Sequence, residues 1–324
     1  MSFLTVCLNP TLQKTLCFPS ITPNAVNRTG VHYLDVSGKG INVTRVLTQL
    51  GKKAVHLTHL GCEMRTLFLS LCEQDGLAVN WVESNSQIRF CYTVIDESSG
   101  EVTELVEEAE LVSPQTETHL LEKFDSLLED ASPLNSSSLR SLRLGGFARN
   151  LSCVIISGTK AAGYSDTVIP DIVHKAKEKG LRIILDIKGK DLIESLKYEP
   201  DVIKPNIDEF IETFGLGKEC PRKSAKIPSG FVRGLMLELA QKHRCRIILT
   251  NGSKKILTAD KNNYNEIDPT ACAARAVNTT GCGDAFTAGL AAALESKADI
   301  NTAINEGIRC GALNAALLRP GVIM

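Results

Sequence analysis

The sequence of 324 residues carries almost no net charge and no long apolar run. Its 36 lysines and arginines nearly cancel its 37 aspartates and glutamates, which leaves a formal net charge of -1. A chain with this balance has no overall attraction for nucleic acid or an anionic membrane. No apolar stretch approaches the length of a membrane span. We therefore expect no nucleic-acid or membrane partner, and any anionic ligand must be held by local groups.

Targeting and redox motifs are absent as well. The N-terminal segment MSFLTVCLNP lacks the basic region and the longer apolar stretch of a signal peptide, and it is typical of a first strand. The 11 cysteines include no C-x-x-C pair, which argues against a zinc ribbon or a dithiol redox site. We expect a cytoplasmic protein with reduced, mostly buried thiols.

Two well-known nucleotide-binding fingerprints are also missing. The chain contains no Walker A sequence. A nicotinamide dehydrogenase needs G-x-G-x-x-G after a strand, and both GKGINV and GCGDAF lack the third glycine. Any nucleotide site in this chain must therefore have another form.

The chain does contain a regular alternation of β-rich and helical segments. Residues 41–51 place apolar side chains at helical spacing and end in a glycine, whereas residues 153–157, 169–180 and 182–186 predict a strand–helix–strand unit. The other segments that we assign are strands at 3–9, 54–60, 201–206 and 246–251 and a helix from Met64 to Asp75. This order predicts one α/β domain over residues 1–324, with a doubly wound, mostly parallel sheet flanked by helices.

Residues 12–37 and 88–112 interrupt this alternation. They contain short alternating strands, such as RFCYTVID and EVTELVEE, and neither region has a helix that would serve as a crossover. We predict that they form a small antiparallel β lid, in which the glutamates at 104, 107, 108 and 110 make a solvated face. Residues 131–150 are predicted to be an inserted loop.

The stretch NTTGCGDAF, residues 278–286, carries the clearest chemical signal. Glycines before a helix let backbone N–H groups approach an anion, and the helix N-terminus adds partial positive charge. An aspartate such as Asp284 would repel a bound phosphate if it were only a cap, so it makes more sense as a base for an attacking hydroxyl. Taken alone, the stretch also fits an ordinary capping aspartate after a glycine turn.

The same stretch resembles the C-terminal signature D/N-T-x-G-A-G-D-x-F of the PfkB (ribokinase-like) family of sugar kinases. Cys282 stands where the family has alanine. The resemblance implies a ribokinase-like fold, an anion hole at Gly281, Cys282 and Gly283, and a catalytic base at Asp284.

A second motif lies near the N-terminus. SGKGINVTRVLTQLG is similar to the family's G-G-K-G-x-N-x-A-x-x-L-x-x-L-G. The resemblance implies that Gly38 and Lys39 hold an anionic group of the substrate and that Asn42 binds a sugar hydroxyl. Arg89 matches an arginine that assists with the substrate's phosphate.

Three further motifs relate to the nucleotide and follow in the family's order. KPNIDEF resembles K-P-N-x-x-E, LTNG corresponds to a turn beside the ATP phosphates, and CGALNAALLRPG is similar to a helix that flanks adenine. The resemblance implies ATP and Mg²⁺ as cofactors, with the metal held indirectly through phosphates or water. The residues so implied are Asn206 and Glu209 for the metal-bound phosphates and Thr250, Gly252 and Asn314 for the nucleotide.

Within the family, several segments favour the branch of 1-phosphofructokinase and tagatose-6-phosphate kinase. VCLNPTLQKT resembles T-L-N-P-A-L-D-x-T, NAVNRTG resembles G-E-V-N-R, and the lysine of the S-G-K-G loop is retained. Gln13, a substrate-binding candidate, replaces the aspartate that binds substrate hydroxyls, and Lys160, Ala161 and Ala162 replace an L-P-P run. These departures alter the sugar pocket and leave the phosphoryl-transfer motifs intact.

The sequence therefore predicts an ATP-dependent kinase that converts a sugar phosphate, fructose 1-phosphate first, to a bisphosphate. Tagatose-6-phosphate kinase or another PfkB-type sugar kinase is the alternative within the family. A non-catalytic sugar-phosphate sensor is the alternative of another class, which Gln13 invites and the retention of Asp284, Asn206 and Glu209 opposes. Because relatives often pair through their lids, we also expect a homodimer through the lid.

Overall fold

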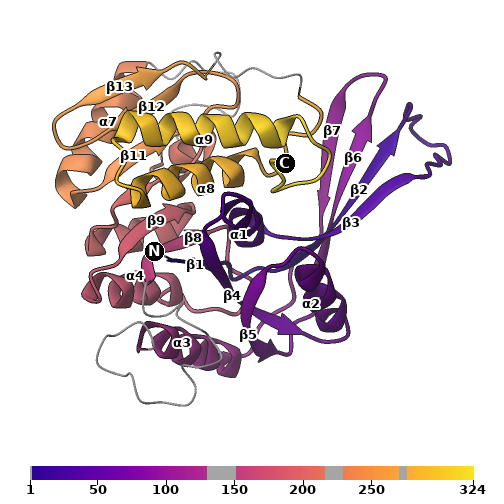
Figure 1. Cartoon of the computed structure of the whole chain (residues 1–324), viewed down its shortest axis with the longest axis horizontal. Helices are drawn as coiled ribbons and strands as arrows, with labels where there is room; N and C mark the ends of the chain where they lie inside the picture. Colours follow the sequence, from indigo (N-terminus) through magenta and orange to yellow (C-terminus); the bar gives the residue numbers. More distant parts are fainter. Residues whose placement is uncertain (1, 130–150, 216–228, 270–275) are drawn as a thin grey trace.

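The computed structural model describes residues 2–129, 151–215, 229–269 and 276–324. Its main body is built around a central β-sheet (Figure 1). Its nine described strands are β1 (Ser2–Val6), β4 (Lys53–Gly61), β5 (Ala78–Ser84), β8 (Leu151–Ser157), β9 (Arg182–Asp186), β10 (Val202–Ile203), β11 (Arg246–Leu249), β12 (Ile256–Ala259) and β13 (Tyr264–Ile267). They lie in the order β13-β12-β11-β10-β9-β8-β1-β4-β5. Neighbours from β11 to β5 pair in parallel, and β12 and β13 add antiparallel pairs at one edge. The predicted loop at 131–150 lies outside the described residues.

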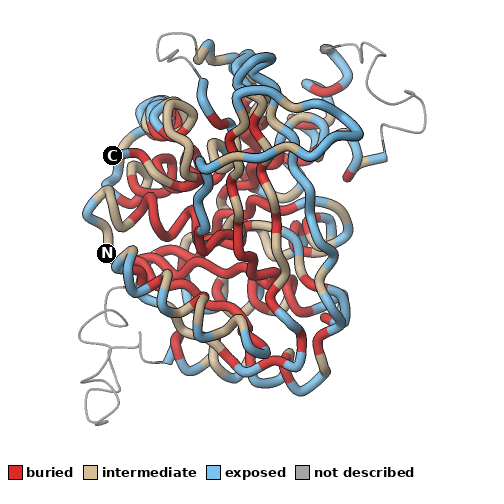
Figure 2. The backbone as a smooth tube through the Cα atoms, turned by 90° about the vertical axis from the view of Figure 1, so that its right-hand side faces the viewer, coloured by how far each residue is buried: buried red, intermediate tan, exposed pale blue. Residues whose placement is uncertain are grey.

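Helices cover both faces of this sheet, because successive residues of a strand point to opposite sides. On one face Phe3 of β1 packs with α1 (Lys39–Gln49), α8 (Cys282–Glu295) and α9 (Ile300–Ala315). On the other face Leu4 belongs to the cluster that contains residues of α3 (Pro114–Glu129), α4 (Val168–Glu178), α5 (Gly189–Ser195), α6 (Ile207–Thr213), α7 (Ser229–His243) and the 3-10 turn η2 (Leu196–Tyr198). Figure 2 shows the buried segments running through the middle of the molecule. The predicted doubly wound, mostly parallel sheet is confirmed.

A second sheet of four strands projects from the main body (Figure 1). Its strands are β2 (Thr11–Phe18), β3 (Val31–Ser37), β6 (Arg89–Asp96) and β7 (Glu101–Val106), in the order β3-β2-β6-β7. The hairpins β2–β3 and β6–β7 are antiparallel, and β2 and β6 join them by a parallel pairing. At its base, Leu12 and Val36 pack against Phe68 of α2 (Met64–Gln74). The predicted small sheet is therefore present, and we call it the lid.

The carboxyl ends of the parallel strands meet at one edge of the large sheet. Ser157 ends β8, Asp186 ends β9, and Lys204 follows β10 directly. In doubly wound sheets this edge is the usual place for a ligand site. No helix among the described residues combines the length and the apolar character that a membrane crossing requires.

Candidate active site

A cavity of ≈ 590 Å³ lies between the lid and the carboxyl edge of the large sheet. Its wall includes Thr11 and Cys91 from the lid and Asp186 and Lys204 from the sheet edge. It also includes most of the residues that the sequence singled out: Gln13, Gly38, Lys39, Asn42, Arg89, Asn206, Glu209, Thr250, Gly281, Gly283 and Asp284. Residues as far apart in the chain as Thr11 and Asp284 are thus brought to one cavity by the fold.

Three of the predicted residues do not line this cavity. Gly252 lies two residues beyond Thr250 in an exposed turn, and the thiol of Cys282 points back to the carbonyl of Asn278 at 3.9 Å. Asn314 is fully buried, and its amide binds the carbonyl of Arg319 and the N–H of Gly321. The side chain of Asn314 is therefore committed to the C-terminal turn and does not face the cavity, and its contact with adenine stays a prediction.

The glycine turn before α8 needs glycine for two reasons. Gly281 has φ +83°, a backbone conformation that residues with a side chain rarely adopt. A Cβ atom at Gly281 would also lie 2.9 Å from Asn314 Oδ1 and 2.9 Å from the N–H nitrogen of Gly321. The buried Asn314 thus packs behind the turn and holds the start of α8 against the C-terminal segment. This packing places Asp284 in the first helical turn, facing the cavity.

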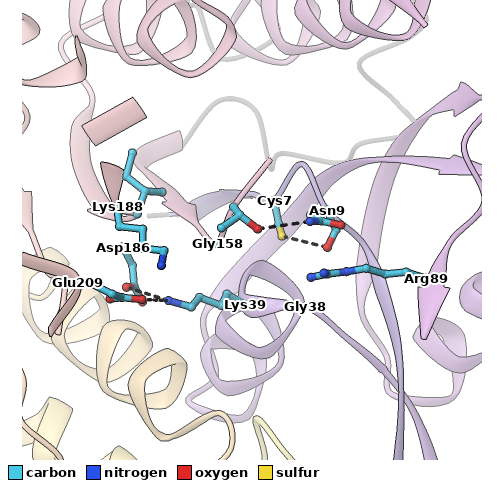
Figure 3. Close-up of a pocket in the computed structure, with 11 residues that line it drawn as sticks. Cys7, Asn9, Gly38, Lys39, Arg89, Gly158, Asp186, Lys188 and Glu209 are labelled. Carbon is cyan, nitrogen blue, oxygen red and sulfur yellow. Dashed lines mark hydrogen bonds and ion pairs between the residues drawn. The ribbon is translucent and has the colours of Figure 1, made fainter. Parts of the chain in front are cut away.

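Lys39 is the first residue of α1 and follows Gly38, whose φ is +102°. Its Nζ lies 3.6 Å from Asp186 Oδ1 and 3.4 Å from Glu209 Oε1 (Figure 3). The Asp186 carboxylate is the main cause of a raised pKa for Lys39, so this amine stays charged at neutral pH. The N-termini of α1 and α8 therefore both face the cavity and carry positive potential into it.

Asp186 and Lys204 were not assigned by the sequence analysis. Lys204 Nζ lies 3.3 Å from Asp186 Oδ2, and Thr287 donates a hydrogen bond to the same oxygen at 3.1 Å. Burial raises the pKa of Asp186, but Lys204 and Lys39 outweigh it and hold that pKa below its ordinary value. The available signal was an ionisable residue at the end of one buried parallel strand and another directly after the next.

Asp284 is 5% exposed and accepts a hydrogen bond from Asn42 Nδ2 at 2.8 Å. Burial raises its pKa to about 7, with the Asp186 carboxylate adding to this, while Lys39, Asn42 and Lys204 act in the opposite direction. A carboxylate with a pKa near neutrality is suited to accept a proton in the working range of an enzyme.

Cys282 does not carry a reactive thiolate in this setting. Burial, together with the nearby Asp284 carboxylate, raises the pKa of its thiol to about 12. The positive end of α8 does not offset these two effects. Cys282 is therefore best explained as a small residue that fills the place of alanine.

A smaller branch of the site, of ≈ 130 Å³, extends past Lys39 and Arg89 (Figure 3). Arg89 donates to Thr11 Oγ1 at 3.1 Å and to the carbonyl of Glu107 at 3.2 Å, which fixes its guanidinium at the mouth of the lid. Asn9 is 7% exposed and donates to Thr159 Oγ1 at 3.3 Å, but its buried Oδ1 atom has no hydrogen-bond partner. This branch thus combines cationic groups with an unused acceptor.

The departures from the family pattern have local explanations. Gln13 is 4% exposed and donates to Thr93 Oγ1 at 2.7 Å, so its amide nitrogen is already used within the lid. Lys160 forms ion pairs with Asp191 at 2.5 Å and Asp166 at 3.6 Å, outside the two cavities. The lysine that replaces a leucine therefore adds no charge to the candidate site.

The residues proposed for the metal form a helix cap. Asn206 Oδ1 accepts the N–H of Glu209, and Glu209 Oε2 accepts the N–H of Asn206, a reciprocal capping box at the start of α6. Among the described residues, no group of three or more His, Cys, Asp or Glu side chains could hold a metal directly. A hard cation such as Mg²⁺ would fit here only with most of its oxygen ligands coming from phosphates and water.

One lid residue reaches the glycine turn directly. Glu104 of β7 accepts a hydrogen bond from Thr280 Oγ1 at 2.9 Å, next to Gly281. Glu104 is exposed, as expected for the glutamates of this strand, but it also lines the large cavity. The lid and the start of α8 therefore touch across the mouth of the site.

Comparisons with known proteins agree with this geometry. The family model described as pfkB family carbohydrate kinase matches residues 21–319. Three similar solved structures are phosphofructokinase-2 of Escherichia coli in complex with fructose-6-phosphate (TM-score 0.78, 21% identity, 97% of this chain and 93% of that chain), a possible 1-phosphofructokinase of Thermotoga maritima (TM-score 0.77, 20% identity, 98% and 93%) and ribokinase of Thermotoga maritima (TM-score 0.65, 15% identity, 98% and 94%). At these identities the structures establish a shared, ribokinase-like fold.

Proposed function

We propose that this chain, which belongs to the pfkB family of carbohydrate kinases, transfers the γ-phosphoryl group of ATP to a sugar phosphate. The preferred acceptor in this proposal is fructose 1-phosphate, which would become fructose 1,6-bisphosphate. Tagatose 6-phosphate is the next candidate, and the neighbour from Escherichia coli adds fructose-6-phosphate as a ligand to test.

The environment of Asp284 is the observation that carries the proposal. A buried carboxylate, with a pKa near 7, stands in the first turn of α8 beside a glycine turn and two lysines. In the proposed reaction Asp284 takes the proton of the acceptor hydroxyl as its oxygen bonds to the γ-phosphorus and the bond to the ADP leaving group breaks. The backbone N–H groups at Gly281, Cys282 and Gly283 would stabilise the charge on the transferring group.

The cationic branch supports an acceptor that is already phosphorylated. Lys39 and Arg89 line the main cavity and also its smaller branch, at the point where the two join. An arginine held by Thr11 and by a backbone carbonyl is preorganised for a phosphate or carboxylate group. The unpartnered Asn9 Oδ1 would accept a hydrogen bond from a hydroxyl of the same ligand.

The nucleotide side of the proposal rests on the segments after β10 and β11. Asn206, Glu209 and Thr250 line the cavity opposite the lid, and Gly252 extends the same turn. We place the phosphates of ATP along these residues. Mg²⁺, when bound to those phosphates, supplies further neutralisation of charge during transfer. The lid would exclude water from the transferring group.

The proposal can be tested by measuring ATP consumption with a panel of acceptors. The panel holds fructose 1-phosphate, fructose 6-phosphate, tagatose 6-phosphate, fructose and a nucleoside. We expect sugar phosphates to give the highest kcat/KM; turnover of unphosphorylated sugars or nucleosides alone would overturn the assignment of Lys39 and Arg89. Tight sugar-phosphate binding with no turnover would instead favour the non-catalytic sensor.

A matched pair of variants sharpens this test. Arg89→Gln should raise KM for the sugar phosphate about tenfold or more and leave KM for ATP unchanged, because it removes one charged contact to the acceptor. Arg65→Gln changes an arginine of α2 that pairs with Glu83 outside the site, and it should leave both constants unchanged.

A further inference from the structure

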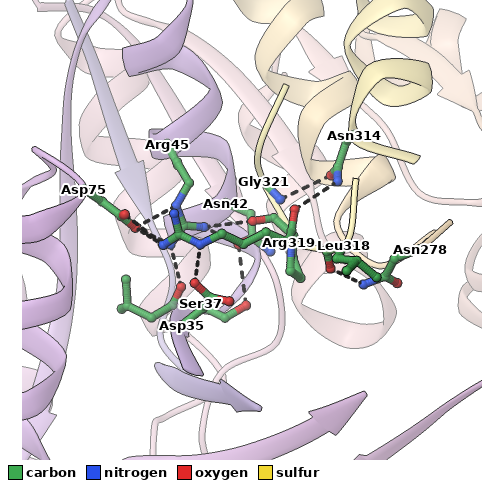
Figure 4. Close-up of polar contacts among 12 residues, drawn as sticks. Asp35, Ser37, Asn42, Arg45, Asp75, Asn278, Asn314, Leu318, Arg319 and Gly321 are labelled. Atoms are coloured by element: carbon green, nitrogen blue, oxygen red, sulfur yellow. Dashed lines mark hydrogen bonds and ion pairs between the residues drawn. The ribbon is translucent and has the colours of Figure 1, made fainter. Parts of the chain in front are cut away.

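Asn42 contacts both Asp284 and the buried Arg45, and Figure 4 shows its contact with Arg45. Its Nδ2 donates to Asp284 Oδ2 at 2.8 Å, and its Oδ1 accepts from Arg45 Nη1 at 3.1 Å and from Ser37 Oγ at 3.5 Å. The two ends of an amide are not equivalent, since one only donates and the other only accepts. Donors at Oδ1 therefore determine that the NH₂ group, and not the oxygen, faces the carboxylate.

The position of Arg45 is itself tightly defined. The residue is 3% exposed, and its guanidinium donates to Asp75 at 3.0 Å, to the carbonyl of Val36 at 2.6 Å and to the carbonyl of Pro320 at 3.0 Å. These partners come from the C-cap of α2, from the lid strand β3 and from the C-terminal turn. A planar guanidinium with four fixed acceptors cannot rotate without leaving buried groups unpaired.

We propose that Arg45 is a positioning residue for the base, acting through the orientation of the Asn42 amide. The proposal rests on the proposed kinase function, in which Asp284 accepts the hydroxyl proton. With Oδ2 of Asp284 occupied by Asn42, the other carboxylate oxygen is left to face the acceptor hydroxyl. If the Asn42 amide were flipped, its oxygen would face the Asp284 carboxylate and favour the protonated, inactive form of the base.

Other ionisable groups also act on Asp284, and they stay constant in the test. Lys39 from α1, Asp186 from β9 and Lys204 after β10 act on the charge of the carboxylate, and the thiols of Cys7 and Cys282 lie within its electrostatic reach. None of these groups bonds to Arg45 among the hydrogen bonds and ion pairs of the described residues. A change in the pKa of Asp284 that is caused by a substitution at Arg45 can therefore be distinguished from the effects of these groups.

Arg319 offers a matched control in the same buried network. It donates to both carboxylate oxygens of Asp75 at 2.8 Å and pairs with Asp35, but no hydrogen bond of the described residues joins it to Asn42 (Figure 4). Arg319→Gln thus removes a guanidinium of the same cluster without touching the amide. A purely structural role for the cluster would make the Arg45 and Arg319 variants alike.

The first experiment compares Arg45→Gln, Arg45→Lys and Arg319→Gln in the full chain. Both Arg45 variants should lower kcat about tenfold, leave KM for ATP within about twofold, and move the acidic limb of the kcat profile up by about one pH unit. Arg319→Gln should lower the melting temperature without moving that limb. The lysine variant keeps the charge opposite Asp75 and so preserves a folded protein to measure if Arg45→Gln fails to fold. The proposal would be overturned if all three variants changed kcat equally and none of them moved the acidic limb of the kcat profile.

The second experiment tests whether Arg45 works through Asn42. In an Asn42→Ala background the Arg45→Lys change should have no further effect on kcat, because the orientation it controls is gone. If the two substitutions together lowered kcat by the product of their separate factors, Arg45 would act independently of Asn42.

Titration of the Asp284 carboxyl by carbon NMR, assigned with Asp284→Asn, needs no substrate. An upward shift of the titration midpoint of Asp284 in Arg45→Lys supports the positioning role even if the acceptor panel shows no sugar-phosphate turnover. An unchanged midpoint refutes that role.

Discussion

At the scale of single residues, the site depends on how one carboxylate is balanced between opposing influences. Burial and Asp186 favour the protonated form of Asp284, whereas Lys39, Lys204 and Asn42 favour the charged form. The result is a pKa of about 7, which leaves the group both available as a base and able to release its proton.

This balance predicts how activity depends on pH. We expect kcat to rise with pH through about 7 as Asp284 loses its proton, and then to level off. Asp284→Asn should lower kcat by about 10²- to 10⁴-fold with little change in ATP affinity, because an amide cannot accept the proton. Initial rates from pH 5.5 to 9 would check the profile; a wild-type rate independent of pH, or an active asparagine variant, would contradict the role of this residue.

The same carboxylate also predicts how stability depends on pH. Its pKa is about 7 in the folded chain and 3.8 as its ordinary value in the unfolded chain. Between these values the folded state holds a proton that the unfolded state has released, so this group lowers the free energy of unfolding as pH rises from about 4 to 7. Asp284→Asn should therefore be more stable than the wild type at pH 8, by up to about 4 kcal/mol, and similar near pH 4.

Urea unfolding of both proteins at pH 5 and pH 8 would measure this difference. The stability gained by the asparagine variant should be larger at pH 8 than at pH 5. A gain of equal size at both values would mean that the carboxylate is not destabilised by its burial.

At the scale of elements, two helix starts and a lid hairpin create the site. The turns at Gly38 and Gly281 both use positive φ angles, and each leads directly into a helix that faces the cavity. The hydrogen bond from Thr280 to Glu104 then connects the second turn with the lid. Backbone geometry at these turns therefore matters as much as side-chain chemistry.

Gly281→Ala should reduce both stability and activity. The added methyl group meets Asn314 and the Gly321 nitrogen at 2.9 Å and must also adopt a positive φ, which together cost about 1–3 kcal/mol. Gly234→Ala is the control, because no atom lies within 4 Å of its added Cβ in α7 and it should stabilise the helix by up to about 1 kcal/mol. Thermal melts and kcat measure both effects; unchanged values for Gly281→Ala would exclude a strained turn.

At the scale of the whole molecule, the lid leaves apolar side chains exposed to solvent. These are Val26, Val31, Tyr33, Leu34, Leu105 and Val106. Val31 and Tyr33 share one face of the edge strand β3 and Leu34 lies on the other face, while Leu105 and Val106 lie on β7 at the opposite edge of the sheet. Exposed apolar groups on a projecting sheet are typical of a surface that another chain covers. We propose a second copy of this chain as the partner, paired lid to lid.

Tyr33→Glu should convert the expected dimer to a monomer, because it places a charge within the apolar surface. His32→Glu is the control for the face of β3 that carries Val31 and Tyr33, since His32 points to the opposite face of the sheet. Sedimentation velocity at several concentrations would measure the mass. A wild-type monomer, or an equal effect of both changes, would contradict pairing through the face that carries Tyr33.

Much of the fold was predictable because its signals are local. The apolar periodicity of residues 41–51 anticipated α1, and the strand–helix–strand pattern around residues 153–186 anticipated the parallel order of β8 and β9. The lid was predictable from two segments that lack a crossover helix. The parallel pairing of β2 with β6 was not, because it joins segments far apart in the chain.

The sequence by itself determined the family and the position of the glycine turns, and it singled out Asp284 as the candidate base, because these depend on residues close together along the chain. Only the tertiary structure decided how that acid is tuned. Asp186, Lys204 and Arg45 come from other elements, and their influence depends on distance and burial, which no local pattern encodes. The orientation of Asn314 was not predictable for the same reason, since only packing shows that its amide is turned inward to the C-terminal segment.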